Sequence, residues 1–382
     1  MSATPLKQLG RLRVDTFMRT SWQRRPRLFR QALPSFASPV DRQTLFALAA
    51  RDDVESRLVT AFGGRWRLAH GPFAARALPR PTRAGWTLLV QGVDLHLPAV
   101  AALRERFRFI GDAQLDDVMV SFASDGGGVG PHVDSYDVFL VQAQGRRRWR
   151  ISRQRDLALV PGLPLKILAD FRPTQAWVLD PGDLLYLPPG VAHEGTALGD
   201  DCITCSVGFR APAFRELADP WFDALAEQAY ALPGLRTQLR DPARRPTRHP
   251  AQLPAAMIAL AQRRLAALRP TRAHATIALL ALLSEPKPVV RFAPPARPAA
   301  RPLFARRIAR HGLHLDLATR LLYADGRIGI NGETAALAAA ERAAVARLAD
   351  QRGLSAAQCA RLSDAVVQRL HGWYVAGWLH AG

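Results

Sequence analysis

The chain has 382 residues, enough for two or three domains that each bury a core. Apolar residues make up 48% of the chain, and no apolar run approaches the roughly 18 residues of a membrane span. Neither a secretory signal nor a disulfide framework is visible. We therefore expect a protein of the reducing cytoplasm. The formal net charge of +20 raises the question of nucleic-acid binding, although the three lysines among 52 basic residues also indicate a compositional preference for arginine.

The first 125 residues combine a predicted helix with short strands. Residues 17–26 are typical of a helix that a proline stops. Residues 53–59 lead toward a strand, and three β-rich runs bounded by Gly, Pro or Asp follow at 66–68, 86–91 and 118–122.

The next stretch carries the residues with the clearest chemistry. The glycine-rich segment 126–130 runs into a predicted strand that carries His132 and Asp134. Residues two apart in a strand share a face, so the imidazole and the carboxylate would converge. Far along the chain, His193 follows a Pro-Pro-Gly turn. Two histidines and one carboxylate around a metal with open positions are the ligands of non-haem Fe(II) oxygenases. We therefore predict a metal site here; the alternative is a polar barrel mouth without a metal.

Further short strands follow that stretch. Residues 137–143 and 146–152 predict a hairpin with a turn at 144–145, and strands are expected at 177–179, 184–187 and 203–209. Many short antiparallel strands at this spacing indicate a closed β-sandwich or barrel.

Consecutive arginines occupy the second half of the predicted hairpin. In a strand Arg147 would share a face with Trp149, and Arg146 with Arg148. A guanidinium inside a barrel is costly without an anionic partner, so one of these faces would meet an anion. The pattern leaves open which face that is.

The second half of the chain has a different pattern. Helices are predicted at 214–229, 257–268 and 273–283, with a proline-rich interruption at 242–254 that contains Pro242, Pro246, Pro250 and Pro254. Residues 286–302 have linker composition. In the tail, 320–323 and 327–330 predict a hairpin, and 338–350 and 355–379 predict two helices, which is compatible with a winged-helix type of module.

Three motifs carry a resemblance to a known family. They are His132-Val-Asp134-Ser-Tyr136-Asp-Val-Phe, Gly145-Arg-Arg147-Arg-Trp149 and Pro188-Pro-Gly-Val-Ala-His193-Glu-Gly. On these residues the chain resembles the JmjC-type ribosomal oxygenases of bacteria, and more narrowly the branch that hydroxylates an arginine of large-subunit ribosomal protein sixteen. Over residues 1–212 the resemblance extends to the individual residues of the motifs. Beyond residue 212 it is a resemblance in pattern more than in individual residues.

The resemblance implies a mixed fold with a division into four parts. It implies a double-stranded β-helix (cupin) catalytic domain at 1–212 and a helical dimerisation region at 213–285. A proline-rich linker at 286–302 and a winged-helix-like domain at 303–382 complete the chain. We accordingly expect a homodimer.

The resemblance also implies the cofactors and the site. His132, Asp134 and His193 would be the ligands of Fe(II), with 2-oxoglutarate and O₂ as cosubstrates. Arg147 would pair with the distal carboxylate of 2-oxoglutarate, and Ser121 would donate its hydroxyl to the same carboxylate. The reaction would hydroxylate the substrate and release succinate and CO₂.

A cationic substrate side chain needs acceptors or an aromatic face at the mouth of the site. Tyr136, Asp116 and Asp117 are candidates for this role. Two alternatives remain open: an oxygenase that acts on another ribosomal protein or a small molecule, and a non-catalytic cupin protein that binds nucleic acid through its basic tail.

Overall fold

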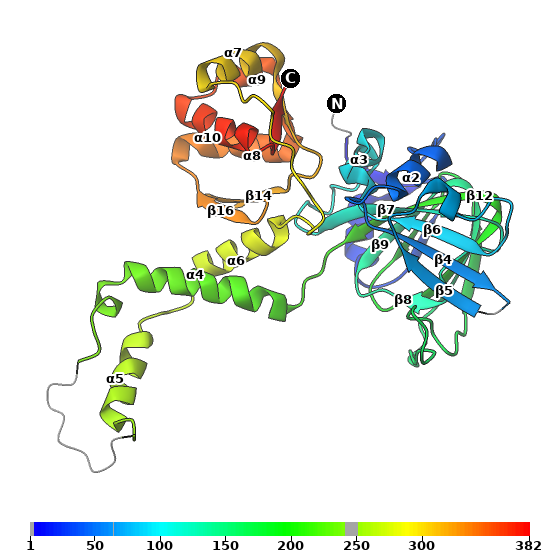
Figure 1. The fold of residues 1–382 in the computed structure, drawn as a ribbon, viewed down its shortest axis with the longest axis horizontal. Helices are drawn as coiled ribbons and strands as arrows, with labels where there is room; N and C mark the ends of the chain where they lie inside the picture. The colour runs from blue at the N-terminus through cyan, green and yellow to red at the C-terminus, as the bar shows by residue number, and fades with distance from the viewer. Residues whose placement is uncertain (1–3, 64, 241–250) are drawn as a thin grey trace.

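The structure, a computed structural model, describes residues 4–63, 65–240 and 251–382. Figure 1 shows a β-rich N-terminal body, a C-terminal module of helices and small sheets, and helices that extend away from both. Within the described residues, no helix combines the length and the apolar content needed to cross a bilayer.

The N-terminal body is built on one large antiparallel sheet. Its strands follow the order β3-β11-β9-β12-β7-β6-β4-β5, with β10 beside β9 and β8 beside β12. The bounds are β3 (Arg27–Phe29), β4 (Ser56–Phe62), β5 (Arg65–His70), β6 (Trp86–Val90), β7 (Leu115–Ala123), β8 (His132–Val133), β9 (Asp137–Ser152), β10 (Gln175–Leu179), β11 (Leu184–Leu187) and β12 (Ala192–Phe209). The predicted antiparallel arrangement is therefore confirmed, although β9 with 16 residues and β12 with 18 are longer than the short strands expected.

Helices and a small hairpin cover one side of this sheet. They are β1 (Gln8–Leu9), β2 (Leu12–Arg13), α1 (Val14–Thr20), α2 (Arg42–Ala49) and α3 (Pro98–Glu105). The predicted helix at 17–26 is shorter and earlier than expected, since α1 ends at Thr20. Phe17 of α1 packs edge-on against Tyr186 of β11, with their ring centroids 4.9 Å apart.

Alternation along the strands separates this packed side from a cavity. On β7, Val118, Val120 and Phe122 belong to the main apolar core. Their neighbours Asp117, Met119 and Ser121 line the cavity instead. Because successive side chains of a strand point to opposite faces, the same strands build both the core and the site.

The hairpin predicted at 137–152 is wrong. Strand β9 runs unbroken through Gly145, because β12 pairs with it on both sides of that residue. The pairing register shifts between Leu198 and Ile203 of β12. Gly145 has a φ of +62°, and a Cβ there would lie 2.6 Å from the carbonyl oxygen of Asp201. Gly145 therefore lies at an irregularity of the pairing where β12 carries additional residues, and β9 does not reverse its direction there.

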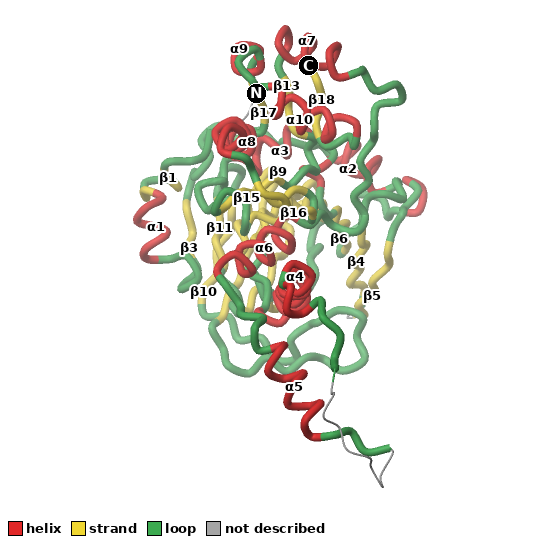
Figure 2. The backbone as a smooth tube through the Cα atoms, turned by 90° about the vertical axis from the view of Figure 1, so that its left-hand side faces the viewer, coloured by secondary structure: helices red, strands yellow, loops and turns green. Residues whose placement is uncertain are grey.

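The middle of the chain is helical, as predicted. It contains α4 (Ala218–Ala231), α5 (Ala255–Leu265) and α6 (Arg272–Ser284), and α4 packs against α6. Pro242, Pro246 and Pro250 lie outside the described residues. Figures 1 and 2 both show α5 projecting away from the large sheet.

The C-terminal module has its own core, with Phe304, Leu348 and Trp373 among its members. The predicted tail hairpin is confirmed as β14 and β15 around Asp325-Gly326. Helix α6 packs on these wing strands. The elements are α7 (Arg301–His311), β13 (Leu313–Leu315), β14 (Leu321–Ala324), β15 (Arg327–Ile330), β16 (Glu333–Ala336), α8 (Ala339–Gln351), β17 (Gly353–Leu354), α9 (Ala356–Cys359), α10 (Asp364–Val375) and β18 (Leu379–Ala381).

The single helix predicted at 355–379 is wrong. The segment forms α9, then α10, then β18, which pairs with β13. Ser363, at the start of α10, has extended backbone angles (φ −73°, ψ 158°), so a continuous helix is interrupted there. The predicted domain bounds at 212, 285 and 302 stay predictions.

Candidate active site

Three side chains of the predicted metal site lie together at the end of the barrel. His132 on β8 and His193 at the start of β12 are partners across the two strands, and Asp134 follows β8. The Nε2 atom of His193 is 3.5 Å from Oδ2 of Asp134, and that of His132 is 3.9 Å from Oδ1. One ligand atom from each residue lies within 4.8 Å of the others. The geometry therefore leaves room for one ion between three donor atoms.

Backbone contacts orient both imidazoles. Nδ1 of His132 lies 2.9 Å from the carbonyl oxygen of Gly130, and Nδ1 of His193 lies 2.9 Å from that of Val191. A carbonyl only accepts, so each Nδ1 carries the hydrogen and donates it. Each Nε2 then keeps its lone pair for the centre, which is the arrangement that metal-binding histidines need.

Burial shapes the protonation of the three groups. It lowers the pKa of His193 to about 3, with His132 acting in the same direction. His193 is therefore neutral near pH 7 and able to coordinate. Burial raises the pKa of Asp134, while His132 and a hydrogen bond from Tyr136 oppose that rise. A cation at the centre would favour the ionised carboxylate. The donor set fits a divalent metal.

The glycine-rich segment 126–130 packs closely against β12. The amide of Gly126 donates to the carbonyl of Ala197, and the amide of Ala197 donates to the carbonyl of Gly127. A Cβ at Gly128 would lie only 2.5 Å from the carbonyl oxygen of Gly195. Only a glycine allows this close approach, which places β8 beside the start of β12.

A cavity of about 710 Å³ adjoins the three side chains, and Arg147 and Ser121 line it with them. Arg147 is 5% exposed, whereas Arg146 and Arg148 are exposed on the outer side of β9. The sequence left open which strand face points inward, and the structure shows that it is the face that carries Arg147. The Arg147 guanidinium carbon lies 5.8 Å from the centre of the Trp149 ring, and its Nε lies 3.5 Å from Sγ of Cys202.

The guanidinium of Arg147 is incompletely satisfied. Its Nη2 is buried and has no hydrogen-bond partner among the described residues. A buried cationic donor without a partner is unfavourable, so the position favours an anion that enters the cavity. Ser121, which is 3% exposed, lies on β7 opposite Thr204 of β12. The cavity therefore offers a guanidinium and a hydroxyl near the three candidate ligands.

The three candidate substrate residues also line this cavity. Tyr136 is 40% exposed, and Asp117 is almost fully buried. The structure adds Met119 and Ser206, which sequence reasoning missed and which are direct strand partners on β7 and β12. Alternation could have indicated Met119, since it lies between Asp117 and Ser121 on the same face of the strand.

Known protein families match both halves of the chain. Residues 102–217 match the JmjC domain, and residues 267–380 match the ROXA-like winged helix. The chain is 40% identical over 215 residues to the ribosomal protein uL16 3-hydroxylase of Escherichia coli, a stretch that covers 56% of each chain. It is 37% identical over 209 residues to a probable ribosomal oxygenase of Haemophilus influenzae, covering 54% of this chain and 51% of that one. These alignments span about half the length of the two relatives.

Solved structures extend the similarity to the whole chain. The structure of E. coli YcfD is 31% identical, with a TM-score of 0.83 over 98% of this chain and 99% of the other. A structure of YcfD in complex with cobalt and 2-oxoglutarate has a TM-score of 0.79, 31% identity and coverage of 97% and 98%.

The antiparallel barrel and the matched JmjC domain define a 2-oxoglutarate-dependent dioxygenase of JmjC type. The predicted double-stranded β-helix, helical region and winged helix are thereby confirmed. More specifically, this chain belongs to the family of bacterial ribosomal oxygenases that includes YcfD.

Proposed function

We propose that this protein hydroxylates an arginine side chain of ribosomal protein uL16, with consumption of 2-oxoglutarate and O₂ and release of succinate and CO₂. The observation that carries the proposal is the buried guanidinium of Arg147, whose Nη2 has no hydrogen-bond partner among the described residues, in one cavity with His132, Asp134 and His193. The name of the E. coli relative, uL16 3-hydroxylase, supports the choice of substrate. A ribosomal substrate would place the protein in the cytoplasm.

His132 and His193 would hold Fe(II) through Nε2, and Asp134 through its carboxylate. When bound, the iron supplies the oxidising power for hydroxylation of an unactivated carbon. Arg147 would pair with the distal carboxylate of 2-oxoglutarate, because a guanidinium can donate two parallel hydrogen bonds to it. Ser121 would donate its hydroxyl to the same carboxylate.

The mouth of the cavity suits a cationic side chain. Asp116 and Asp117 supply carboxylates and Tyr136 supplies an aromatic ring along the same cavity. A guanidinium combines well with both kinds of group. Val138, Leu140 and Trp149 add apolar walls that limit the water around the reacting carbon.

Mass spectrometry tests the proposed substrate. We expect purified protein with Fe(II) and 2-oxoglutarate to add one oxygen atom to a uL16 peptide, and uL16 from cells without the gene to lack that atom. A peptide with lysine in place of the target arginine is the matched control and should stay unmodified. An added oxygen on a different ribosomal protein, or on a small molecule, would replace uL16 as the substrate. Salt-sensitive nucleic-acid binding without any turnover would favour the non-catalytic alternative.

We also propose that the helical region forms a homodimer. Phe222 and Tyr230 on α4 are 65% and 75% exposed, and Ile258 and Leu265 on α5 are exposed as well. Large apolar side chains gathered on projecting helices favour burial against another surface. The symmetric partner would be a second copy of the chain.

Light scattering on a size-exclusion column tests the dimer. We expect the wild type to have twice the mass of one chain and Phe222→Glu to shift toward the monomer, because a charge in the apolar interface is costly. Leu303→Glu is the matched control, since Leu303 is exposed on α7 of the C-terminal module. A monomeric wild type would contradict the proposal.

A further inference from the structure

A lysine from the C-terminal half of the chain contacts the carboxylates of Asp116 and Asp117 at the cavity mouth. Lys287 lies between α6 and α7, in the segment that leads to the C-terminal module. Its Nζ atom is 2.6 Å from Oδ2 of Asp117 and 3.3 Å from Oδ2 of Asp116. A residue far along the sequence thus contacts both acidic residues on β7.

Three donors converge on a single oxygen of Asp117. Its Oδ2 accepts from Nζ of Lys287, from Nε2 of Gln91 at 2.8 Å and from the amide of Gly92 at 3.0 Å. The other oxygen, Oδ1, accepts no hydrogen bond from the described residues and lies toward Gly208, where an added Cβ would be 3.8 Å away. Gly208 lines the cavity. The carboxylate is therefore anchored through one oxygen, and the other is left on the cavity side.

The charges of this cluster depend on one another. Burial lowers the pKa of Lys287, but Asp117 and Asp116 outweigh it, and the net shift is upward. Lys287 is therefore protonated at neutral pH. Asp117 is 3% exposed, and burial of a carboxylate is costly unless a cation or several donors compensate for the loss of water. Lys287 supplies both the charge and a donor.

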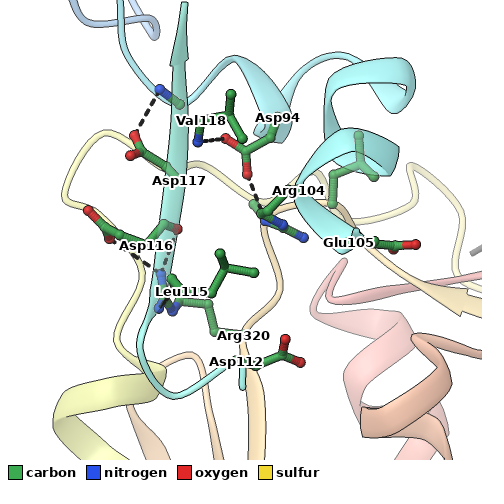
Figure 3. Close-up of polar contacts among 12 residues, drawn as sticks. Asp94, Arg104, Glu105, Asp112, Leu115, Asp116, Asp117, Val118 and Arg320 are labelled. Atoms are coloured by element: carbon green, nitrogen blue, oxygen red, sulfur yellow. Dashed lines mark hydrogen bonds and ion pairs between the residues drawn. The ribbon is translucent and has the colours of Figure 1, made fainter. Parts of the chain in front are cut away.

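A second cation, Arg320 of the C-terminal module, contacts the backbone beside Asp117. Arg320 donates from Nη2 to the carbonyl of Leu115 at 2.7 Å and from Nη1 to that of Asp116 at 3.3 Å. Figure 3 shows Arg320 beside Leu115 and Asp116, with Asp117 further along the same strand. The start of β7 is thus secured through its backbone by Arg320, and Lys287 is left to orient the side chain of Asp117.

We propose that Lys287 is a positioning residue for substrate binding. It holds the Asp117 carboxylate so that Oδ1 faces the cavity and can accept from the cationic side chain of the substrate. The segment between α6 and α7 would thereby complete the substrate site of the barrel. The inference rests on the proposed function, because it requires a substrate with a positive charge.

Replacement of Lys287 by methionine keeps an unbranched side chain of similar bulk and removes the ammonium group with its charge. We expect Lys287→Met to raise KM for the uL16 peptide about tenfold, the effect of one charge-assisted hydrogen bond, with kcat and the KM for 2-oxoglutarate nearly unchanged. Lys287→Arg should restore most of the loss. The matched control is Arg291→Met, which removes a cation of the same segment that, among the described residues, donates to the carbonyl oxygens of Pro288 and Val290.

A double-mutant cycle separates positioning from a general structural effect. If Lys287 acts through Asp117, Lys287→Met should add little in an Asp117→Asn background. An unchanged peptide KM, an equal change in the KM for 2-oxoglutarate, or a full effect in the Asp117→Asn background would each overturn the inference.

Anaerobic peptide binding, with Fe(II) and 2-oxoglutarate present, distinguishes this inference from the proposed function. A wild type that binds the peptide but does not hydroxylate it, together with weaker binding by Lys287→Met, would overturn only the proposed function. A wild type that hydroxylates the peptide, together with equal binding by Lys287→Met, would overturn only the inference. A wild type that neither binds nor hydroxylates the peptide would overturn both.

Discussion

Asp134→Ala and His132→Ala are each expected to lower Fe(II)-dependent succinate formation by more than about a hundredfold, because loss of a direct ligand should exceed the loss seen when only an outer hydrogen-bond partner is removed. Asp134 is the one anionic group among the three donors, and His132 supplies one of the two nitrogen atoms. Conversion of 2-oxoglutarate to succinate measures the effect without any peptide substrate.

The control for these variants is His70→Ala. His70 is an exposed residue at the end of β5, and it should be replaceable without loss of turnover. The iron content of each purified variant provides a second measurement, which should fall together with succinate formation. Wild-type turnover in Asp134→Ala or in His132→Ala would refute the proposed ligand set.

Arg147→Met is expected to raise the KM for 2-oxoglutarate about a hundredfold. The substitution would leave the distal carboxylate of the cosubstrate buried without its cation, and the loss of one partner of a buried charge pair costs roughly 2–5 kcal/mol. Arg148→Met is a stringent control, because Arg148 is the next residue of the same strand and is exposed on its outer side.

The same variant should separate binding from stability. In the ligand-free protein the buried Nη2 of Arg147 has no partner among the described residues, so replacement of Arg147 by methionine should leave the melting temperature unchanged or raise it. Added 2-oxoglutarate should then raise the melting temperature of the wild type and of Arg148→Met, but hardly that of Arg147→Met. An unchanged KM in Arg147→Met would refute the role of Arg147 as the partner of the distal carboxylate.

The candidate metal ligands could be identified from local features of the sequence. His132 and Asp134 are two residues apart and converge in the structure, although β8 ends at Val133 and Asp134 lies just beyond the strand. His193 follows a turn at the start of a strand and pairs directly with His132. Their assignment as metal ligands, and the cosubstrate roles of Arg147 and Ser121, stay predictions for the variants above.

In β9 the pairing with β12 determines the structure, although the local sequence predicts a turn. Gln144-Gly145 has the composition of a turn, and a glycine with positive φ occurs equally in a reversal and in a bulge. Strand β12 decided between them, since it pairs with β9 on both sides of Gly145. The same pairing decides that Arg147 is buried and that Arg148 is exposed.

The sequence by itself determined the antiparallel strands, the helical middle, the hairpin of the tail and the pair of His132 and Asp134, because each of these depends on a local period or on residues near one another in the chain. The pairing of β8 with β12 brings His193, which is distant in the sequence, to this pair. Only the tertiary structure decided which arginine enters the cavity and what anchors Asp117. Burial of one strand face depends on all the strands that close the barrel, and the contact between Lys287 and Asp117 joins residues that no local pattern relates.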